Sequence, residues 1–296
     1  MNQPPKAKLY IEGRYLKHTR DLPQTVFFCP VCKGHQRRRH GCKRCDGFGK
    51  LTKDSVQELV GWVIGKAAGT RKHKFHGAGR EDVDVRMLGE GRPFVFELES
   101  AKVTELDLAA LEETINSRNE GRMEVRGLHW TQKSRIAFLK QGKFVKDYRA
   151  KVAVSELPDP DRAQSLVGER YVVAQKTPGR VAHRRADLVR ERWIELLAIE
   201  LPEEDSAAGD AEQPHIHVTM RTQAGTYVKE AISGEDGMTE PSVAARLGIA
   251  DARCIELDVM AILAEPGPDD EPGEGSESPA PAAVHVDPPP TFGAGI

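Results

Sequence analysis

Apolar residues between positions 54 and 69 recur every three or four positions, a spacing typical of one face of a helix. They are Val56, Leu59, Val60, Val63, Ile64 and Ala67. Ser55 and Glu58 match a capping box, and Gly69 stands where a helix would end. The pattern therefore predicts a helix over residues 54–69. Two further segments, 106–116 and 241–247, predict shorter helices.

Seven other segments combine apolar, β-branched and aromatic residues in the way that strands do. They are residues 94–99, 124–130, 144–154, 171–175, 193–201, 215–222 and 254–263. These strands are separated irregularly and do not alternate steadily with helices. The arrangement favours an α+β fold around a mixed sheet over a doubly wound fold.

The chain is predicted to have three parts. Residues 1–53 contain a cysteine-bearing module, and residues 54–265 contain the predicted strands and helices. In residues 266–296 Pro, Gly, Ser, Ala and acidic residues dominate, so this tail is expected to be disordered. The acidic segment 202–214 separates two predicted strands and predicts a long hairpin loop.

The net charge of −2 conceals an uneven distribution. Residues 202–213 hold five acids, residues 265–296 hold seven more, and neither segment contains Lys or Arg. Setting these 12 acids apart from the 45 Asp and Glu leaves 33, against 43 Lys and Arg, or about +10 for the rest. This excess is compatible with a polyanionic partner, and an ordinary basic surface is the alternative.

The sequence predicts a cytoplasmic protein. No apolar run approaches the roughly 20 residues that span a bilayer, and the first residues lack the apolar core of a signal peptide. Four of the five cysteines lie within residues 29–45. In a reducing compartment such a cluster indicates metal binding rather than disulfides.

These four cysteines form two C-x₂-C pairs separated by nine residues, and we expect them to hold a structural Zn²⁺. The ligands would be Cys29, Cys32, Cys42 and Cys45. His35 and His40 are alternative ligands, but four cysteines leave them no vacancy. The second pair also resembles half of a chaperone-type C-x₂-C-x-G-x-G array. Basic residues decorate the module, which suits phosphate contacts or a solvated surface.

Two aspartates lie between two arginines in the segment 79–86, directly after glycine. Asp82 and Asp84 are flanked by Arg80 and Arg86, and neighbouring cations favour the ionised form of a carboxylate. An ionised carboxylate can serve as a nucleophile. The alternative is that one aspartate pairs with Arg86 and only holds the loop in shape.

Three segments further along the chain carry candidate functional side chains. Tyr148 lies in a predicted strand, where it is either catalytic or half-buried core. Lys229 follows Tyr227 by two residues where a predicted strand turns into a helix. The turn 175–187 suits binding of a phosphate backbone because it is strongly basic. Its basic residues are Lys176, Arg180, His183, Arg184 and Arg185.

In this order the four motifs resemble those of the pseudouridine synthase superfamily. They are most similar to the archaeal and eukaryotic pseudouridine synthase ten family, which acts on the T-arm of tRNA. The motifs are Gly79-Arg80-Glu81-Asp82, Lys146-Asp147-Tyr148, residues 175–187 and Gly225-Thr226-Tyr227-Val228-Lys229. The similarity extends over residues 25–262 and includes the cysteine pairs.

The resemblance implies a mixed, largely antiparallel sheet of the pseudouridine synthase type, preceded by a small four-cysteine zinc knuckle. It implies isomerisation of uridine to pseudouridine at T-arm positions 54 and/or 55 of tRNA. Asp82 would be the catalytic carboxylate, as nucleophile or as stabiliser of the opened sugar. Tyr148 would be the active-site aromatic residue, and Lys229 would be the basic residue that keeps Asp82 charged.

The resemblance also bears on substrate binding, cofactors and partners. The expected substrate-binding residues are Arg80, Arg86, Tyr227, Lys176, Arg180, His183, Arg184 and Arg185. Zinc would be structural, no organic cofactor is expected, and tRNA is the expected partner. Neither a membrane nor an obligate protein partner is expected.

One departure from the family concerns RNA binding. Its known members usually carry a THUMP-containing region between the cysteine module and the catalytic domain. Here Lys50 leads directly into the helix predicted from residue 54, which leaves no room for that region. Substrate binding should therefore depend on the cysteine module and the basic turn. The rival hypotheses are a non-catalytic zinc-containing RNA-binding protein and, third, a protein-interaction adaptor.

Overall fold

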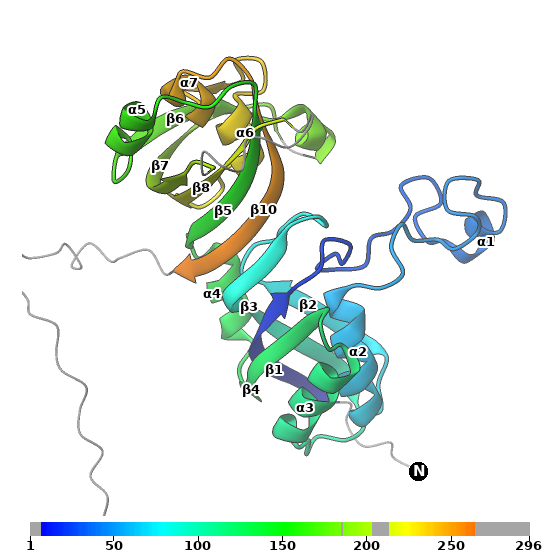
Figure 1. The fold of residues 1–296 in the computed structure, drawn as a ribbon. Helices are drawn as coiled ribbons and strands as arrows, with labels where there is room; N and C mark the ends of the chain where they lie inside the picture. Colours follow the sequence, from blue (N-terminus) through cyan, green and yellow to red (C-terminus); the bar gives the residue numbers. More distant parts are fainter. Residues whose placement is uncertain (1–6, 185, 203–212, 264–296) are drawn as a thin grey trace, which may run out of the picture. The chain divides into compact units, whose positions relative to one another are not determined.

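Ten strands hydrogen-bond into one sheet in the computed structural model, which describes residues 7–184, 186–202 and 213–263 (Figure 1). The strands are β1 (Ala7–Lys17), β2 (Lys72–Gly77), β3 (Arg86–Ala101), β4 (Met123–Trp130), β5 (Val145–Val154), β6 (Arg170–Lys176), β7 (Val189–Glu200), β8 (His215–Thr222), β9 (Thr239–Glu240) and β10 (Ala252–Leu263). Their order is β4-β1-β3-β10-β5-β8-β7-β6-β9, and β2 pairs with β3 off this path. Only the β10–β3 pairing is parallel among the described strands. This confirms a mixed, largely antiparallel sheet.

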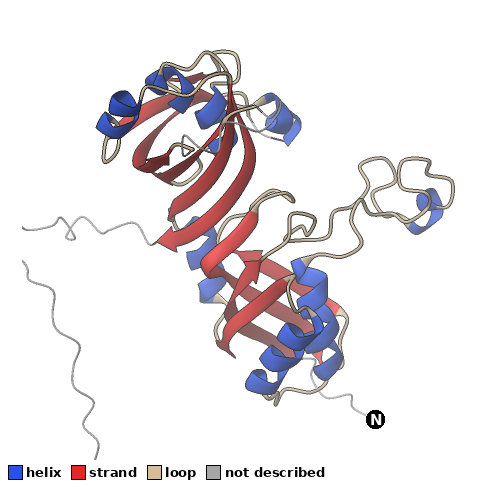
Figure 2. Cartoon of the chain, viewed as in Figure 1, coloured by secondary structure: helices blue, strands red, loops and turns tan. Residues whose placement is uncertain are grey.

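Short helices accompany the strands (Figure 2). They are α1 (Gln36–Arg39), α2 (Val56–Ala67), α3 (Leu108–Arg118), α4 (Ser134–Gln141), α5 (Pro160–Ser165), the 3₁₀ helix η1 (Gly179–Arg184), α6 (Val228–Ser233) and α7 (Val243–Leu247). The helix predicted over 54–69 is confirmed as α2, and Ser55 caps its N-terminus as predicted. The Ser55 hydroxyl accepts from the Glu58 backbone N–H at 3.2 Å and donates to the Glu58 carboxylate at 2.8 Å.

The seven predicted strands correspond to β3–β8 and β10, and the shorter predicted helices correspond to α3 and α7. Strand β1 was not predicted. It pairs with both β3 and β4, so residues 7–17 belong to the main sheet and not to a module that ends at residue 53. Its alternation is obscured because the charged residues Glu12 and Lys17 are buried in it, each with polar partners.

The hairpin expected around the acidic segment agrees with the antiparallel pairing of β7 with β8. Residues 203–212 of that segment lie outside the described residues, as does the tail 266–296. All described residues fall within one compact unit, Met1–Ala264. Among them, no helix is long and apolar enough to cross a membrane.

Candidate active site

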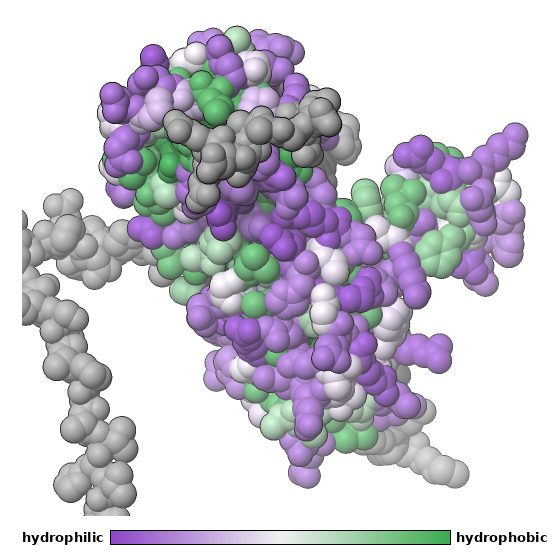
Figure 3. All heavy atoms as spheres, viewed as in Figure 1, coloured by the Kyte–Doolittle hydropathy of each residue, from purple (hydrophilic) through white to green (hydrophobic). Residues whose placement is uncertain are grey.

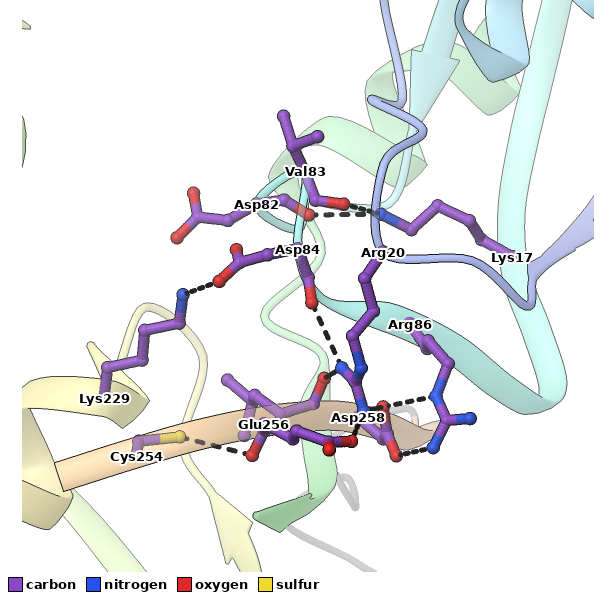
Figure 4. A network of polar contacts seen from close by, with 11 residues as sticks. Lys17, Arg20, Asp82, Val83, Asp84, Arg86, Lys229, Cys254, Glu256 and Asp258 are labelled. Carbon is purple, nitrogen blue, oxygen red and sulfur yellow. Dashed lines mark hydrogen bonds and ion pairs between the residues drawn. The ribbon is translucent and has the colours of Figure 1, made fainter. Parts of the chain in front are cut away.

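The loop between β2 and β3 carries Asp82 and Asp84, and a fully buried lysine from β1 holds its backbone. The Nζ of Lys17 donates to the carbonyl oxygens of Asp82 (3.2 Å), Val83 (2.9 Å) and Leu22 (2.8 Å). Burial lowers the pKa of Lys17 to about 8. In Figure 4 Lys17 meets the loop at the carbonyls of Asp82 and Val83, while the Asp82 side chain extends away from it. Lys17 therefore fixes where the Asp82 side chain emerges.

An arginine just beyond β1 ties the same loop to β10. Arg20 donates to the carbonyl oxygens of Asp84 (3.1 Å) and Leu257 (2.8 Å), and it pairs with Glu256 (2.6 Å) and Asp258 (2.8 Å). Lys17 and Arg20 thus hold the loop through its main-chain oxygens and do not bind its two carboxylates.

Arg86 forms a bidentate pair with Asp258, at 2.8 and 2.5 Å. This hydrogen bonding raises the pKa of Arg86. The alternative that Arg86 pairs with an aspartate of its own loop is therefore wrong. Its partner comes from β10, at the point where β10 and β3 run parallel (Figure 4).

A buried cluster of charged and polar side chains binds the part of the loop that precedes Asp82. Glu81, whose side chain is 1% exposed, accepts from the Tyr15 hydroxyl at 2.8 Å and lies 2.8 Å from Nε of the equally buried Arg92. The Arg92 Nη1 donates to the Ala78 carbonyl at 2.7 Å, and the Gln24 amide donates to the Gly79 carbonyl at 3.0 Å. Burial opposes the charge on Arg92, but Glu81 and other neighbours raise its pKa.

The counter-ion of Asp82 is Arg180, from η1. Its Nη1 lies 2.8 Å from Oδ2 of Asp82, while its other donors bind both carboxylate oxygens of Glu230 in α6. The hydrogen bonds to Glu230 are the main reason that the pKa of Arg180 is raised. The Arg180 guanidinium also lies over the Tyr227 ring, 6.0 Å from its centroid. The Asp82 side chain remains 38% exposed and accessible.

Lys229 does not contact Asp82. Its Nζ instead donates to Oδ2 of Asp84 at 2.7 Å, so the direct partner of Lys229 is the second aspartate of the loop and not the one predicted (Figure 4). Burial opposes ionisation of Asp84, but the hydrogen bond and charge of Lys229 hold its pKa below the ordinary value. Lys229 lies in the first turn of α6, and Glu230 beside it binds Arg180. This turn therefore contacts Asp84 directly through Lys229 and Asp82 indirectly through Glu230 and Arg180.

Tyr148 lies in the centre of the sheet, paired with Val259 of β10 and Met220 of β8. It is half-buried and packs against the hydrophobic core. Burial raises the pKa of its hydroxyl to about 12; the charge of Arg92 opposes this shift, and the charges of Glu81 and Asp82 add to it. A neutral phenol near Asp82 can stack on a base or donate a hydrogen bond.

The backbone of Tyr227 is held by a side chain from β6. Gln175, which is 1% exposed, donates to the Tyr227 carbonyl and accepts from its N–H, both at 3.0 Å. Gly225 precedes this residue with φ +86°, a conformation that L side chains rarely adopt. The Gly-Thr-Tyr motif is therefore a turn that presents Tyr227 next to Arg180.

Of the remaining predicted substrate-binding residues, only Arg80 and Lys176 have side chains within the described residues. Arg80 is exposed and makes no side-chain hydrogen bond or ion pair within the described part of the chain, and Lys176 is also exposed. The side chains of His183 and Arg184, and all of Arg185, lie outside the described residues.

The cysteine sulfurs form a compact cluster that fits one metal ion. All four Sγ atoms lie within 4.8 Å of one another, with Cys29–Cys42 at 3.8 Å and Cys32–Cys45 at 3.7 Å. Four sulfurs arranged tetrahedrally at a Zn–S distance of about 2.3 Å would be about 3.8 Å apart. The cluster, with Leu51 packed beside it, is a separate small core. These residues could hold a metal.

Sequence patterns missed several residues that shape the site. Tyr15, Lys17 and Arg92 are buried polar residues of strands, and Glu230 lies in a helix too short to show a clear period. Glu81 was visible inside the Arg-Glu-Asp motif, but only the fold directs it inward. No spacing rule links these residues, since they come from distant segments.

Comparison with known proteins adds a family assignment. A family model described as "Pus10, C-terminal" matches residues 10–263. The chain is 42% identical over 255 residues to "tRNA pseudouridine synthase Pus10" of Methanothrix thermoacetophila, covering 86% of this chain and 53% of that protein. It is 42% identical over 256 residues to the protein of the same name from Methanothermobacter marburgensis, covering 86% and 60%. The chain thus spans between half and two thirds of these relatives.

Solved structures show a weaker likeness. "Crystal Structure of a Cbf5-Nop10-Gar1 Complex" matches with a TM-score of 0.37 and 17% identity, covering 70% of this chain and 45% of that chain.

Proposed function

Since this chain belongs to the Pus10 family, we propose that it isomerises uridine to pseudouridine in tRNA, with Asp82 as the catalytic carboxylate. The observation that carries the proposal is the setting of Asp82. Its side chain is accessible and paired with Arg180 at 2.8 Å, while its backbone is held by buried Lys17. A carboxylate held so that its position is fixed and its charge balanced suits attack on the sugar at the glycosidic bond.

The proposed reaction begins when the target uridine flips out of the base stack into the active site, at a cost of a few kcal/mol. Asp82 then acts at the ribose–base junction, as nucleophile or as stabiliser of the opened sugar. The C–N glycosidic bond breaks, the base rotates, and a C–C bond forms at the same sugar carbon. The proposed targets are T-arm uridines, at positions 54 and/or 55.

The other side chains of the site position Asp82 or contact the substrate. Arg180 orients Asp82, because its remaining donors are fixed by Glu230. Tyr148 and Tyr227 offer aromatic faces near this pair, which suits a flipped base. Arg80 is exposed and without a partner in the described residues, which leaves its charge available to a phosphate. We propose the same role for Lys176, His183, Arg184 and Arg185. Arg86 is not assigned this role, because its guanidinium is paired with Asp258.

Structural zinc and a cytoplasmic location belong to the same proposal. Cys29, Cys32, Cys42 and Cys45 would hold the zinc, whose role is to fold the module that precedes α2. A reducing compartment would keep these four thiols available as ligands.

Incubation with unmodified tRNA transcript, followed by carbodiimide mapping of pseudouridine, tests the proposal. Asp82→Asn should abolish product while tRNA binding survives, because the amide keeps the shape of the side chain and loses its charge. Asp84→Asn is the matched control in the same loop and should retain measurable turnover. Wild-type protein that forms no pseudouridine, or an Asp82→Asn variant that still does, would contradict the proposal.

A further inference from the structure

The cysteine module exposes aromatic rings that no metal site requires. Phe28 is 53% exposed and Phe48 is 52% exposed, and Val31 beside them is 65% exposed. Figure 3 shows hydrophobic residues gathered on this module with hydrophilic ones around them. The module's own core is its cysteine cluster and does not use these rings.

Both rings are anchored by local contacts. The backbone segment around Phe28 pairs with the segment around Lys50, through a bridge between these two residues. A Cβ added to Gly34 would lie 2.5 Å from the Phe28 ring, so this ring rests directly against the glycine. The Lys50 ammonium lies 5.2 Å from the centre of the Phe48 ring and is itself fixed by Glu58 at 2.7 Å. Each ring therefore has a local contact that favours its exposed position.

The surroundings of the rings are strongly cationic. Between positions 27 and 50 the chain has one acidic residue, Asp46. Five exposed cations make no side-chain hydrogen bond or ion pair within the residues that the structure describes; these are Lys33, Arg37, Arg38, Lys43 and Arg44. Unpaired cations beside open aromatic faces match a single-stranded polynucleotide, whose phosphates bind the cations while its bases stack on the rings. An apolar protein surface would instead desolvate these charges without compensation.

We infer that the cysteine module binds a single-stranded RNA segment by stacking unpaired bases on Phe28 and Phe48. The identification of the polynucleotide as RNA rests on the proposed function. Stacking is tolerant of sequence because every base has a π-face. This surface therefore contributes affinity for the substrate, and the loop that carries Asp82 determines which uridine reacts.

The test is fluorescence anisotropy of the full chain with a labelled oligouridylate, measured over a range of KCl concentrations. Phe28→Leu and Phe48→Leu keep apolar volume but remove the π-face, and each should weaken binding at least about fivefold without changing the salt slope. Arg37→Gln and Arg38→Gln should instead flatten the slope by about 0.7 for each phosphate that is no longer neutralised. Val31→Ala, on the same module, should bind as wild type does. Metal content equal to that of wild type verifies that each variant is folded.

Two outcomes would overturn the inference. One is wild-type affinity in the double variant Phe28→Leu/Phe48→Leu. The other is an equal loss in Val31→Ala, which would indicate non-specific apolar contact. Pseudouridine formation by wild type is measured separately. Binding that depends on both rings, in a protein that forms no pseudouridine, would leave this inference standing and defeat the proposed function.

Discussion

Glu81→Gln perturbs the charged cluster beneath the loop that carries Asp82 without changing the size of the side chain. The substitution removes the negative charge 2.8 Å from Nε of Arg92, while the amide oxygen can still accept from the Tyr15 hydroxyl. Both charged side chains are 1% exposed, so water cannot replace the missing partner. Arg92 would be left as an uncompensated buried cation.

Removing one partner of a buried ion pair costs about 3–5 kcal/mol, and retention of the Tyr15 hydrogen bond favours the lower end, about 3 kcal/mol. For a unit of this size, 1 kcal/mol corresponds to about 2–4 °C in melting temperature. Glu81→Gln should therefore melt roughly 6–12 °C below wild type. The double variant Glu81→Gln/Arg92→Met should recover part of this loss, because it no longer buries an unpaired charge.

Differential scanning calorimetry of the full chain measures these shifts, and activity is then compared below the melting temperature of the weakest variant. Glu200→Gln is the matched control. It breaks an exposed pair with Arg149, and such pairs contribute at most about 1 kcal/mol. A Glu81→Gln variant that melts within about 2 °C of wild type would refute the reasoning, since the shift would then be that of a surface pair. Strictly additive losses in the double variant would refute it too.

Three further predictions concern Lys17, Lys229 and the cysteines. Activity should fall as pH rises through about 8, where Lys17 loses its proton and offers two N–H groups to three carbonyls. The free energy of unfolding should rise between about pH 8 and 10.5, because the folded state releases the Lys17 proton at a lower pH than the unfolded state does. Melting curves therefore distinguish the loss of activity from unfolding. If Lys17→Met loses activity above pH 8 as wild type does, the assignment to Lys17 is contradicted. Single-turnover rates should fall less in Lys229→Gln than in Arg180→Gln, since Arg180 pairs with Asp82; the opposite order would restore Lys229 as its counter-ion. Elemental analysis should find one Zn²⁺ per chain, and less in Cys42→Ser; iron, or no metal in fresh protein, would contradict this.

The sequence by itself determined the features that depend on local spacing. The helix at 54–69 and its Ser55 cap follow from neighbouring residues, and so does the pair of C-x₂-C turns that brings four sulfurs together. The strands β3–β8 and β10 were visible because apolar and β-branched residues cluster within each. The Arg-Glu-Asp motif likewise marked the loop that carries Asp82.

Only the tertiary structure decided which charges meet. Asp82 pairs with Arg180, 98 positions away, and Asp84 pairs with Lys229, 145 positions away. Strand β1 was hidden because its buried charges, Glu12 and Lys17, look polar until their partners from distant segments are known. Hydrophobic periodicity reports burial of apolar surface, and a buried ion is stable only where the fold supplies its partner. The partners of these charges therefore follow from chain topology and not from local pattern.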